Sequence, residues 1–133
     1  MKLITRDTDY AVRALCFIAM NKGEIVTASE LVRELKIPRP FLRKILQVLN
    51  KNGILKSYKG LGGGFVLALP VEKIFLLELV KIFQGKLKLN ECLFKKKICP
   101  NIEKCKLNKK IANIEKFAVA ELTPVSIACL IGR

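Results

Sequence analysis

The chain of 133 residues contains no histidine and no tryptophan, and it has only 11 acidic residues against 25 lysines and arginines. Without histidine, zinc sites that combine cysteine with histidine are excluded, and general acid-base catalysis lacks its usual side chain. No serine motif replaces it, so we expect that the protein is not an enzyme. No apolar run approaches the ~18 residues of a membrane span. No signal peptide is recognisable either, so we expect a cytoplasmic protein with no membrane partner.

The shortage of acidic residues leaves a formal net charge of +14. Such a charge favours a polyanionic partner, either nucleic acid or an acidic membrane surface. Nine lysines and two glutamates fall between Lys86 and Lys110. These lysines either favour thiolates and offset an anionic cluster, or form a solvated basic face. The length and the 51% hydrophobic content allow one core and one further helix that needs a partner.

Three of the five cysteines, Cys92, Cys99 and Cys105, lie in one short segment with six and then five residues between them. The segment has few large apolar residues, so a bound metal centre would help to hold it together. The odd cysteine count disfavours disulfides, and the lack of closely spaced pairs disfavours structural zinc. Because an iron-sulfur cluster tolerates wide spacing, the three are candidate cluster ligands, with zinc and inert thiols as alternatives. Cys16 and Cys129 are expected to be buried core residues.

A helix-turn-helix is predicted between residues 27 and 53. Thr27 followed by Glu30 is a capping box, which begins a first short helix. The prolines of KIPRP predict a tight turn, and Pro40 fits the first turn of a second helix that ends at Gly53. An ordinary helical hairpin is the alternative for this segment alone. The inward stripe of the second helix comprises Phe41, Leu42, Ile45, Val48 and Leu49.

The second helix of a helix-turn-helix enters the major groove of DNA. Arg39 and Arg43 lie near its N-terminal end, where side chains reach base edges. Lys44 and Lys51 are better placed for phosphates. The candidate DNA-binding residues of this unit are Thr27, Arg39, Pro40, Arg43, Lys44, Gln47 and Lys51.

A glycine-rich hairpin is predicted in the stretch ILKSYKGLGGGFVLAL, where four of the eight glycines fall between residues 60 and 64. Lys56 and Lys59 border the tip, and Gly62 and Gly63 permit a close approach to a duplex, as a DNA-binding wing requires. A nucleotide-binding loop is the rival interpretation. It is disfavoured because neither a Lys-Ser nor a Lys-Thr pair follows the glycines. A helix-turn-helix followed by a basic hairpin is a winged helix.

Three further helices are expected. The first covers residues 8–21, with Asp7 or Thr8 as its cap, and another covers residues 71–84. The last follows the cysteine segment and carries an apolar stripe. We expect this stripe to pair with the same stripe of a second copy in a homodimer, because a palindromic DNA site binds a two-fold symmetric protein through both of its halves. Packing on the chain's own head is the alternative. The stripe comprises Leu107, Ile111, Ile114, Phe117 and Leu122.

The predicted fold is therefore mostly helical (α+β). Residues 1–84 form a winged helix-turn-helix domain with a small β-hairpin wing. Residues 85–106 form a cysteine-containing cluster-binding loop. Residues 107–133 form a long C-terminal dimerisation helix and a tail.

The segments TDYAVRAL, LKIPRPFLRKILQVLNKNGILKS and GLGGGFVLA, with the three-cysteine segment and a long final helix, resemble one known family. It is that of the iron-sulfur transcription regulators typified by IscR and NsrR, with the cluster-free CymR type as a relative. The resemblance covers nearly the whole length. It implies a homodimeric repressor or activator that binds a double-stranded, palindromic DNA operator and carries a cluster on Cys92, Cys99 and Cys105.

The resemblance also implies a fourth cluster ligand. In IscR-like members this is a histidine three residues after the third cysteine, where this chain has Asn108. In NsrR-like members it is an aspartate near the start of the first helix, donated by the other subunit, and Asp9 matches it. Asp9 is therefore expected to ligate a four-iron, four-sulfur cluster. Plain helix capping is the alternative role for Asp9, and a two-iron, two-sulfur cluster is the alternative centre.

The expected function is a transcription regulator whose operator affinity depends on a cluster that senses nitric oxide, oxygen or redox state, or cluster supply. A cluster-free regulator that responds to thiol oxidation or to a small molecule is the alternative. An iron-sulfur electron-carrier subunit is disfavoured because a winged helix has no role in electron transfer.

Overall fold

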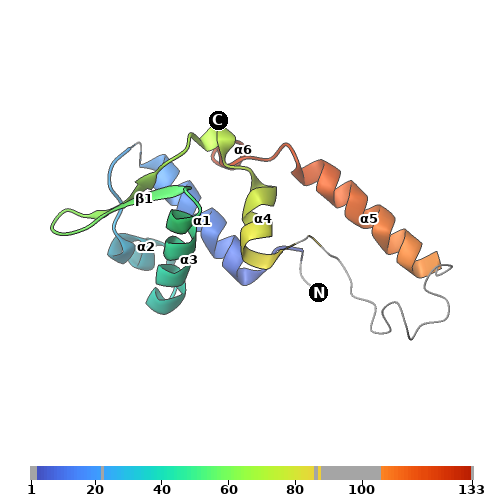
Figure 1. The fold of residues 1–133 in the computed structure, drawn as a ribbon, viewed down its shortest axis with the longest axis horizontal. Coiled ribbons are helices and arrows are strands. Elements are labelled where there is room, and N and C mark those ends of the chain that lie inside the picture. Colours follow the sequence, from blue (N-terminus) through green and yellow to red (C-terminus); the bar gives the residue numbers. More distant parts are fainter. Residues whose placement is uncertain (1–2, 22, 86, 88–105, 133) are drawn as a thin grey trace.

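The computed structural model describes residues 3–21, 23–85, 87 and 106–132, which form a helical head and one long projecting helix (Figure 1). The mostly helical content with one two-stranded antiparallel hairpin confirms the predicted winged helix-turn-helix class. In chain order the elements are α1 (Arg6–Met20), α2 (Ala28–Leu35), α3 (Arg39–Lys51), β1 (Leu55–Tyr58), β2 (Gly64–Leu67), the 3-10 turn η1 (Val71–Lys73), α4 (Leu76–Gln84), α5 (Lys106–Leu122) and α6 (Ile127–Leu130).

Helix α1 lies at the centre of the head. Ala11, Ala14, Leu15 and Ile18 recur at helical spacing and are all buried, so one face of the helix is apolar along its length. Helices α2, α3, α4 and α6 and strand β2 all contact α1. The two alanines have no bulk beyond Cβ, which lets these neighbours approach the helix closely.

The start of α1 differs from the prediction. The helix begins at Arg6 rather than at residue 8, and Thr5 is its N-cap, so the prediction of Asp7 or Thr8 as the cap is wrong. Thr8 is instead buried, and its hydroxyl donates a hydrogen bond of 2.8 Å to Gln84 Oε1. A local capping pattern contains no information about such a distant partner.

The helix-turn-helix has the predicted cap and turn. Thr27 Oγ1 accepts a hydrogen bond of 3.1 Å from the backbone N–H of Glu30, which fixes the start of α2. Lys36 ends α2 in the left-handed conformation, with φ 56°. Pro38 is the N-cap of α3, and Pro40 lies in its first turn, where a missing N–H costs nothing.

The inward face of α3 was predicted with one error. Leu42, Ile45 and Leu49 are buried as expected, whereas Phe41 is 40% exposed, and its predicted core position is wrong. The Arg6 guanidinium lies 4.3 Å from the centre of the Phe41 ring, a cation–π contact that joins the N-terminal turns of α1 and α3. The remaining face residues are Leu46, which is buried, and Val48, which is half-buried.

The hairpin pairs β1 with β2 in the predicted place, and Leu55 lies opposite Leu67. Val26, in the loop before α2, extends this sheet: its N–H donates to Phe65 O at 3.0 Å, and it accepts from Phe65 N at 2.8 Å. The hairpin is therefore attached to the head through β2, and its tip extends past α2 (Figure 1).

The prediction of a single helix over residues 71–84 is wrong. The segment is divided into η1 and α4 because Phe75 pairs in extended conformation with Ser126. Ile127 N donates to Ile74 O at 2.9 Å, and Leu76 N donates to Val125 O at 3.0 Å. Ile127 is fully buried, so the tail that follows α5 returns to the head and completes its core.

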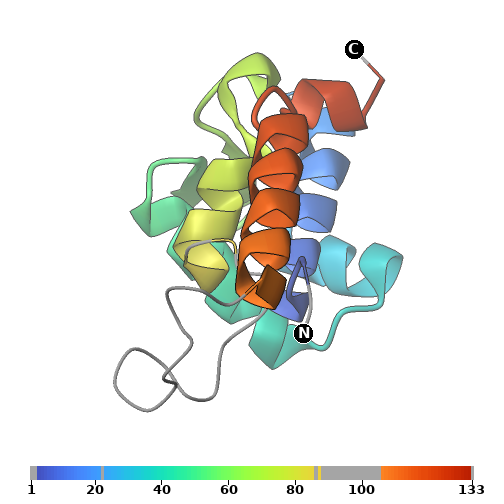
Figure 2. The same cartoon turned by 90° about the vertical axis from the view of Figure 1, so that its right-hand side faces the viewer.

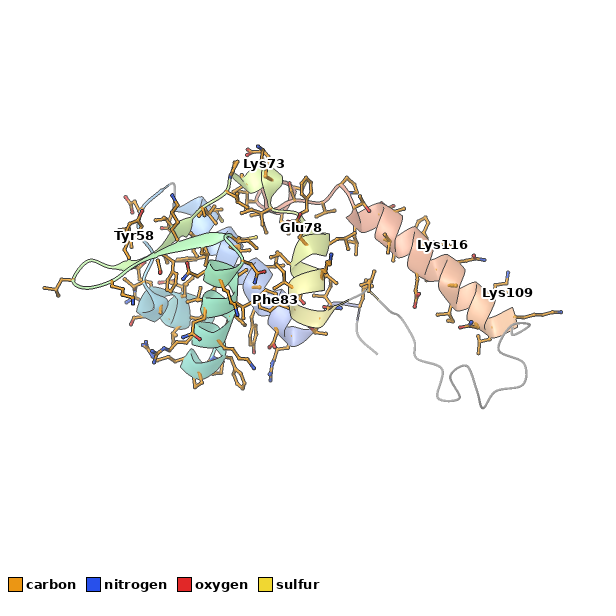
Figure 3. The ribbon with its side chains drawn as sticks, viewed as in Figure 1. Tyr58, Lys73, Glu78, Phe83, Lys109 and Lys116 are labelled. Carbon is orange, nitrogen blue, oxygen red and sulfur yellow. The ribbon has the colours of Figure 1, made fainter. Side chains whose placement is uncertain are left out.

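Helix α5 extends away from the head, and its C-terminal half lies beside α4 (Figures 1 and 2). All 17 of its residues are described, and none is fully buried. Lys109 and Lys116 point away from the head (Figure 3). Among the described helices, none combines the length and the apolar character that a membrane span requires.

We predict that Gly64→Ala lowers the free energy of unfolding by about 1–3 kcal/mol, the usual cost of overpacking. A Cβ at Gly64 would lie 2.6 Å from Val26 O and 2.7 Å from Ile25 Cγ2, so the bridge between Val26 and Phe65 must open. Urea titration measures the effect. Lys56→Ala, at an exposed position of the paired strand, is the control and should change stability by less than about 0.5 kcal/mol. Equal effects of the two substitutions would contradict the close approach.

Candidate nucleic-acid interface and cluster ligands

The outer face of α3 is cationic. Arg39, Arg43, Lys44 and Lys51 are all exposed, as the prediction of DNA contacts requires. Arg39 Nη2 donates a hydrogen bond of 3.2 Å to Ser29 Oγ on α2, which orients the guanidinium at the start of α3. Ser29 was not among the predicted residues, because its partner lies 10 residues away on another helix.

No carboxylate occurs between residues 36 and 70, the range that covers α3 and the hairpin. Within the described part of the chain, the ion pairs join Arg6 to Asp7, Arg13 to Asp9 and Arg33 to Glu34, and none involves a cation of this range. These charges therefore face solvent without local neutralisation, which suits a surface for phosphates. The cations are Lys36, Arg39, Arg43, Lys44, Lys51, Lys56 and Lys59.

The hairpin tip places further candidates beside this face. Lys56, Lys59 and Gly62 are exposed, and Gly60 and Gly62 have φ values of 91° and 78°, which few other residues adopt. Asn50 Nδ2 donates to Ser57 Oγ at 3.4 Å, linking the last turn of α3 to β1. The structure adds Leu61 to the tip, with a relative exposure of 107%. The sequence prediction of DNA-binding residues used lysines and glycines, so it did not select this apolar leucine.

The remaining predicted residues of the interface divide into two groups. Pro40 and Gln47 are exposed on α3, whereas Thr27 and Gly63 are half-buried. Because Thr27 Oγ1 accepts the capping bond, its hydroxyl hydrogen stays able to donate to a phosphate at the α2 N-terminus. Helices α2 and α3 and the hairpin lie at one side of the head (Figure 1). We refer to their exposed candidate DNA-binding residues as the basic surface.

A second group of residues lies where α1 begins and α4 ends. Gln84 Oε1 accepts hydrogen bonds from Thr5 N at 3.0 Å and from Thr8 Oγ1 at 2.8 Å, and Gln84 Nε2 donates to Leu3 O at 3.0 Å. We refer to these three bonds as the Gln84 clamp. The clamp holds the first turn of α1, which carries Asp9, beside the point from which the cysteine segment leaves α4.

Asp9 is accessible at this end of the head. Its side chain is 44% exposed, and its Oδ2 lies 3.0 Å from Arg13 Nε one turn along the helix. Such exposed pairs at four-residue spacing contribute only about 0.3–0.5 kcal/mol, so the carboxylate can change partner at little cost. Asp9 is therefore compatible both with its helix-start role and with a ligand role.

The three candidate cluster cysteines, Cys92, Cys99 and Cys105, lie outside the described residues. Within the described ranges, no group of three or more cysteine or acidic side chains is arranged to hold a metal ion. Cys16 was predicted to be a buried core residue; it is half-buried and packs against the core, and burial raises the pKa of its thiol. The prediction that Cys129 is buried is wrong: it is exposed, and hydrogen bonds from Ser126 lower its pKa.

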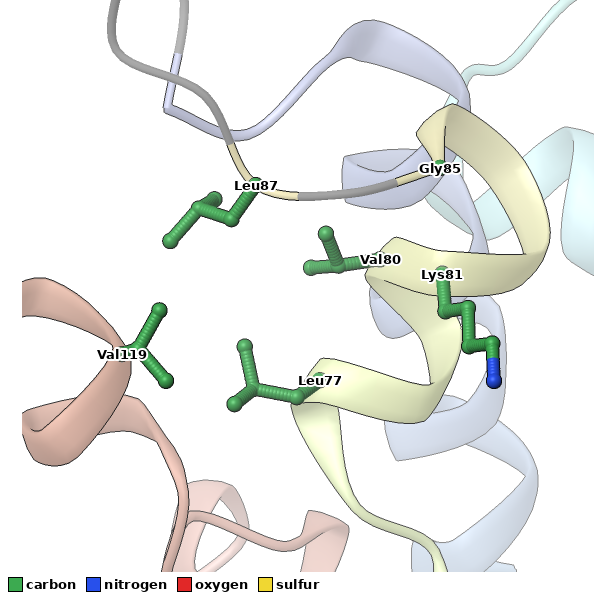
Figure 4. A pocket seen from close by; sticks show the side chains of 6 residues that line it. All are labelled: Leu77, Val80, Lys81, Gly85, Leu87 and Val119. Carbon is green, nitrogen blue, oxygen red and sulfur yellow. The ribbon is translucent and has the colours of Figure 1, made fainter. Parts of the chain in front are cut away.

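An apolar cavity of about 370 Å³ lies between α4 and α5 (Figure 4). Leu77 and Val80 of α4 face Val119 of α5 across it, and Leu87 closes one side. Of the five residues in the predicted stripe of α5, Ile111 and Leu122 are half-buried. Leu107, Ile114 and Phe117 are 67%, 52% and 69% exposed, so the chain's own head does not cover them.

Comparison with known proteins gives a consistent result. Residues 4–133 match the family model Rrf2, described as an iron-dependent transcriptional regulator. A helix-turn-helix regulator of Aquifex aeolicus is 39% identical over 84 residues, which span 63% of this chain and 58% of that protein. The transcriptional regulator NsrR of Bacillus subtilis is 31% identical over 93 residues, 69% of this chain and 63% of that one.

A solved structure shares the fold. That of CymR, the global cysteine regulator of B. subtilis, superposes with a TM-score of 0.79 at 17% identity, covering 99% of this chain and 98% of that one. The chain thus spans less than two thirds of the length of both curated relatives named above, while it matches nearly the whole of this structure.

We predict that Gln84→Ala lowers the free energy of unfolding by about 1–3 kcal/mol, because it removes the Gln84 clamp and leaves the buried Thr8 hydroxyl without its acceptor. Gln47→Ala is the matched control, since Gln47 is exposed on α3. Thermal and urea unfolding of the two variants measure the difference. Indistinguishable stabilities would show that the clamp does not hold α1 against α4.

Proposed function

The chain belongs to the Rrf2 family of iron-dependent transcriptional regulators, and we propose that it is a homodimeric DNA-binding regulator whose operator affinity is controlled by an iron-sulfur cluster. The observation that carries the DNA-binding part is the basic surface, which runs over α3 and the hairpin without a carboxylate between residues 36 and 70. The cluster part is supported by the family and by the three cysteines between α4 and α5.

DNA reading is assigned to α3. Its first two turns carry Arg39 and Arg43, and arginine pairs with guanine in the major groove through two hydrogen bonds. Lys44 and Lys51, with Lys56 of the hairpin, would bind phosphates and fix the orientation of the helix on the duplex. In this assignment the Ser29 hydroxyl holds Arg39 on the α2 side of the groove.

The contact between the two subunits of the homodimer is assigned to α5. A monomer leaves Leu107, Ile114 and Phe117 exposed on one long helix, and apolar side chains at such spacing are stable when they face a partner helix. A second copy is the partner that the function requires, because two recognition helices on one duplex bind a palindromic operator.

The cluster is assigned to Cys92, Cys99 and Cys105 of one subunit, with Asp9 of the other subunit as the fourth ligand. This donor set suits iron, since thiolates are the usual cluster ligands and a carboxylate oxygen binds more weakly. When bound, the cluster supplies an iron site that reacts with nitric oxide, oxygen or oxidants. The accessible carboxylate of Asp9, held only by the weak pair with Arg13, is available to such a site.

The chain's own contacts connect this end of α1 to the recognition helix. Arg6 lies in the same helical turn as Asp9, and its guanidinium packs on Phe41 in the first turn of α3. A ligand that holds Asp9 therefore restrains the turn that touches the start of α3, beside Arg39 and Arg43. This connection is how the state of the cluster would alter operator affinity.

We predict different effects for two basic residues. Arg43→Ala should weaken binding to the operator by about 1–3 kcal/mol and binding to random DNA only slightly, because it removes a base contact. Lys59→Ala should weaken both and reduce the slope of log affinity against log salt by about one, because it removes a phosphate contact. Fluorescence anisotropy over a salt series, with an operator selected from random duplexes, measures both. Equal loss on both DNAs for Arg43→Ala would refute its base-reading role.

The cluster is tested by iron, acid-labile sulfide and visible absorption of protein purified without oxygen. We expect about four irons and four sulfides per chain for a four-iron centre. Loss of even an indirect partner of a metal ligand weakens metal binding about 10- to 100-fold, so Asp9→Ala should shorten the lifetime of the cluster by at least tenfold.

Asp7→Ala is the matched control, because Asp7 lies in the same turn and pairs with Arg6. It should keep the iron content and the lifetime of the parent. If Asp9→Ala and Asp7→Ala behave alike, Asp9 is not a ligand. If the parent holds no iron, the cluster-free thiol regulator takes the place of the cluster proposal, while the DNA-binding part stands.

A further inference from the structure

The tip of the hairpin between β1 and β2 presents one apolar side chain directly to solvent. Leu61 has a relative exposure of 107%, whereas the next most exposed large apolar residue in the described ranges, Phe117, reaches 69%. Single exposed apolar residues are common on protein surfaces and need no explanation by themselves. Leu61 differs from such isolated residues because glycines flank it and lysines lie close to it.

Glycines flank Leu61 on both sides. Gly60 and Gly62 have positive φ values, and Gly63 follows, so no neighbouring side chain shields the leucine or widens the tip. The minor groove of B-DNA is only about 6 Å wide, so only a narrow backbone can enter it. The tip therefore combines a slim backbone with one projecting apolar group.

The charges near Leu61 are all positive, as contact with the phosphates of a DNA groove requires. Lys59 lies two residues before it and Lys56 lies on β1, both exposed, and no carboxylate occurs in the whole range from residue 36 to 70. Lysines beside an inserted group can bind the phosphates that border the groove. The tip also extends beyond α2 on the side of the basic surface (Figure 1).

We propose that Leu61 is an apolar wedge that enters the minor groove beside the α3 site and leans against a base step, partly unstacking it. Leucine is one of the side chains that minor-groove proteins insert in this way, and flexible pyrimidine–purine steps yield most readily. Leu61 thereby adds a preference for deformable sequence at the operator flanks, where α3 makes no base contact. This inference rests on the proposed DNA-binding function.

The test compares Leu61→Ala with Leu130→Ala, a control at a partly exposed leucine of α6. Both are measured on the selected operator, which carries 2-aminopurine at successive flanking steps. Leu61→Ala should weaken binding about tenfold, from lost apolar burial, without changing the salt slope, because no charge is removed. It should also abolish the 2-aminopurine signal that the parent produces at one flanking step. Leu61→Met should restore most of both readouts.

The outcomes separate the two proposals. Unchanged affinity and an unchanged 2-aminopurine signal for Leu61→Ala, with operator binding by the parent intact, overturn the wedge and leave the regulator function standing. Absence of duplex binding by the parent overturns both. The Leu61 side chain is fully exposed, so Leu61→Ala should fold as the parent does. An unchanged thermal midpoint verifies this.

Discussion

The structure depends on the burial of one face of α1. Leu15 is fully buried at its centre, and α2, α3, α4, α6 and the hairpin are all placed by contact with this helix. Burying a leucine contributes about 1.5–3 kcal/mol, and the alanines beside it admit the neighbouring helices. Because α1 touches both α3 and α4, we propose its first turn as the part of the head through which an event at the cysteine segment would reach the basic surface.

Much of this architecture follows from local chemistry that a sequence displays. Thr27 and Glu30 define the start of α2 because a hydroxyl three residues before an N–H caps a helix. The glycines between residues 60 and 64 define the hairpin because few other residues adopt the required backbone angles. The basic surface was predicted from charge and helical periodicity, and α3 indeed exposes Arg39 and Arg43. The DNA contacts themselves stay predictions.

The errors come from contacts between distant parts of the chain. The helix predicted over residues 71–84 is divided because Phe75 pairs with Ser126 in the C-terminal tail. Phe41 was assigned to the core from its spacing, but Arg6 provides a partner at the surface. Thr8 is used by Gln84 rather than as a cap, and the tail exposes Cys129. The partners of Phe75, Phe41 and Thr8 all lie outside the few residues that a periodic pattern covers. The cluster ligands on the cysteine segment likewise stay predictions.

The central claim is that the cluster end of α1 and the basic surface are energetically coupled. The most direct measurement is the operator affinity of one anaerobic preparation before and after removal of its iron, at identical salt. Coupling between two sites is typically worth about 5- to 150-fold in affinity, and we predict a change in this range. Equal affinities of the two forms would contradict the account, because the cluster would then have no influence on the recognition helix.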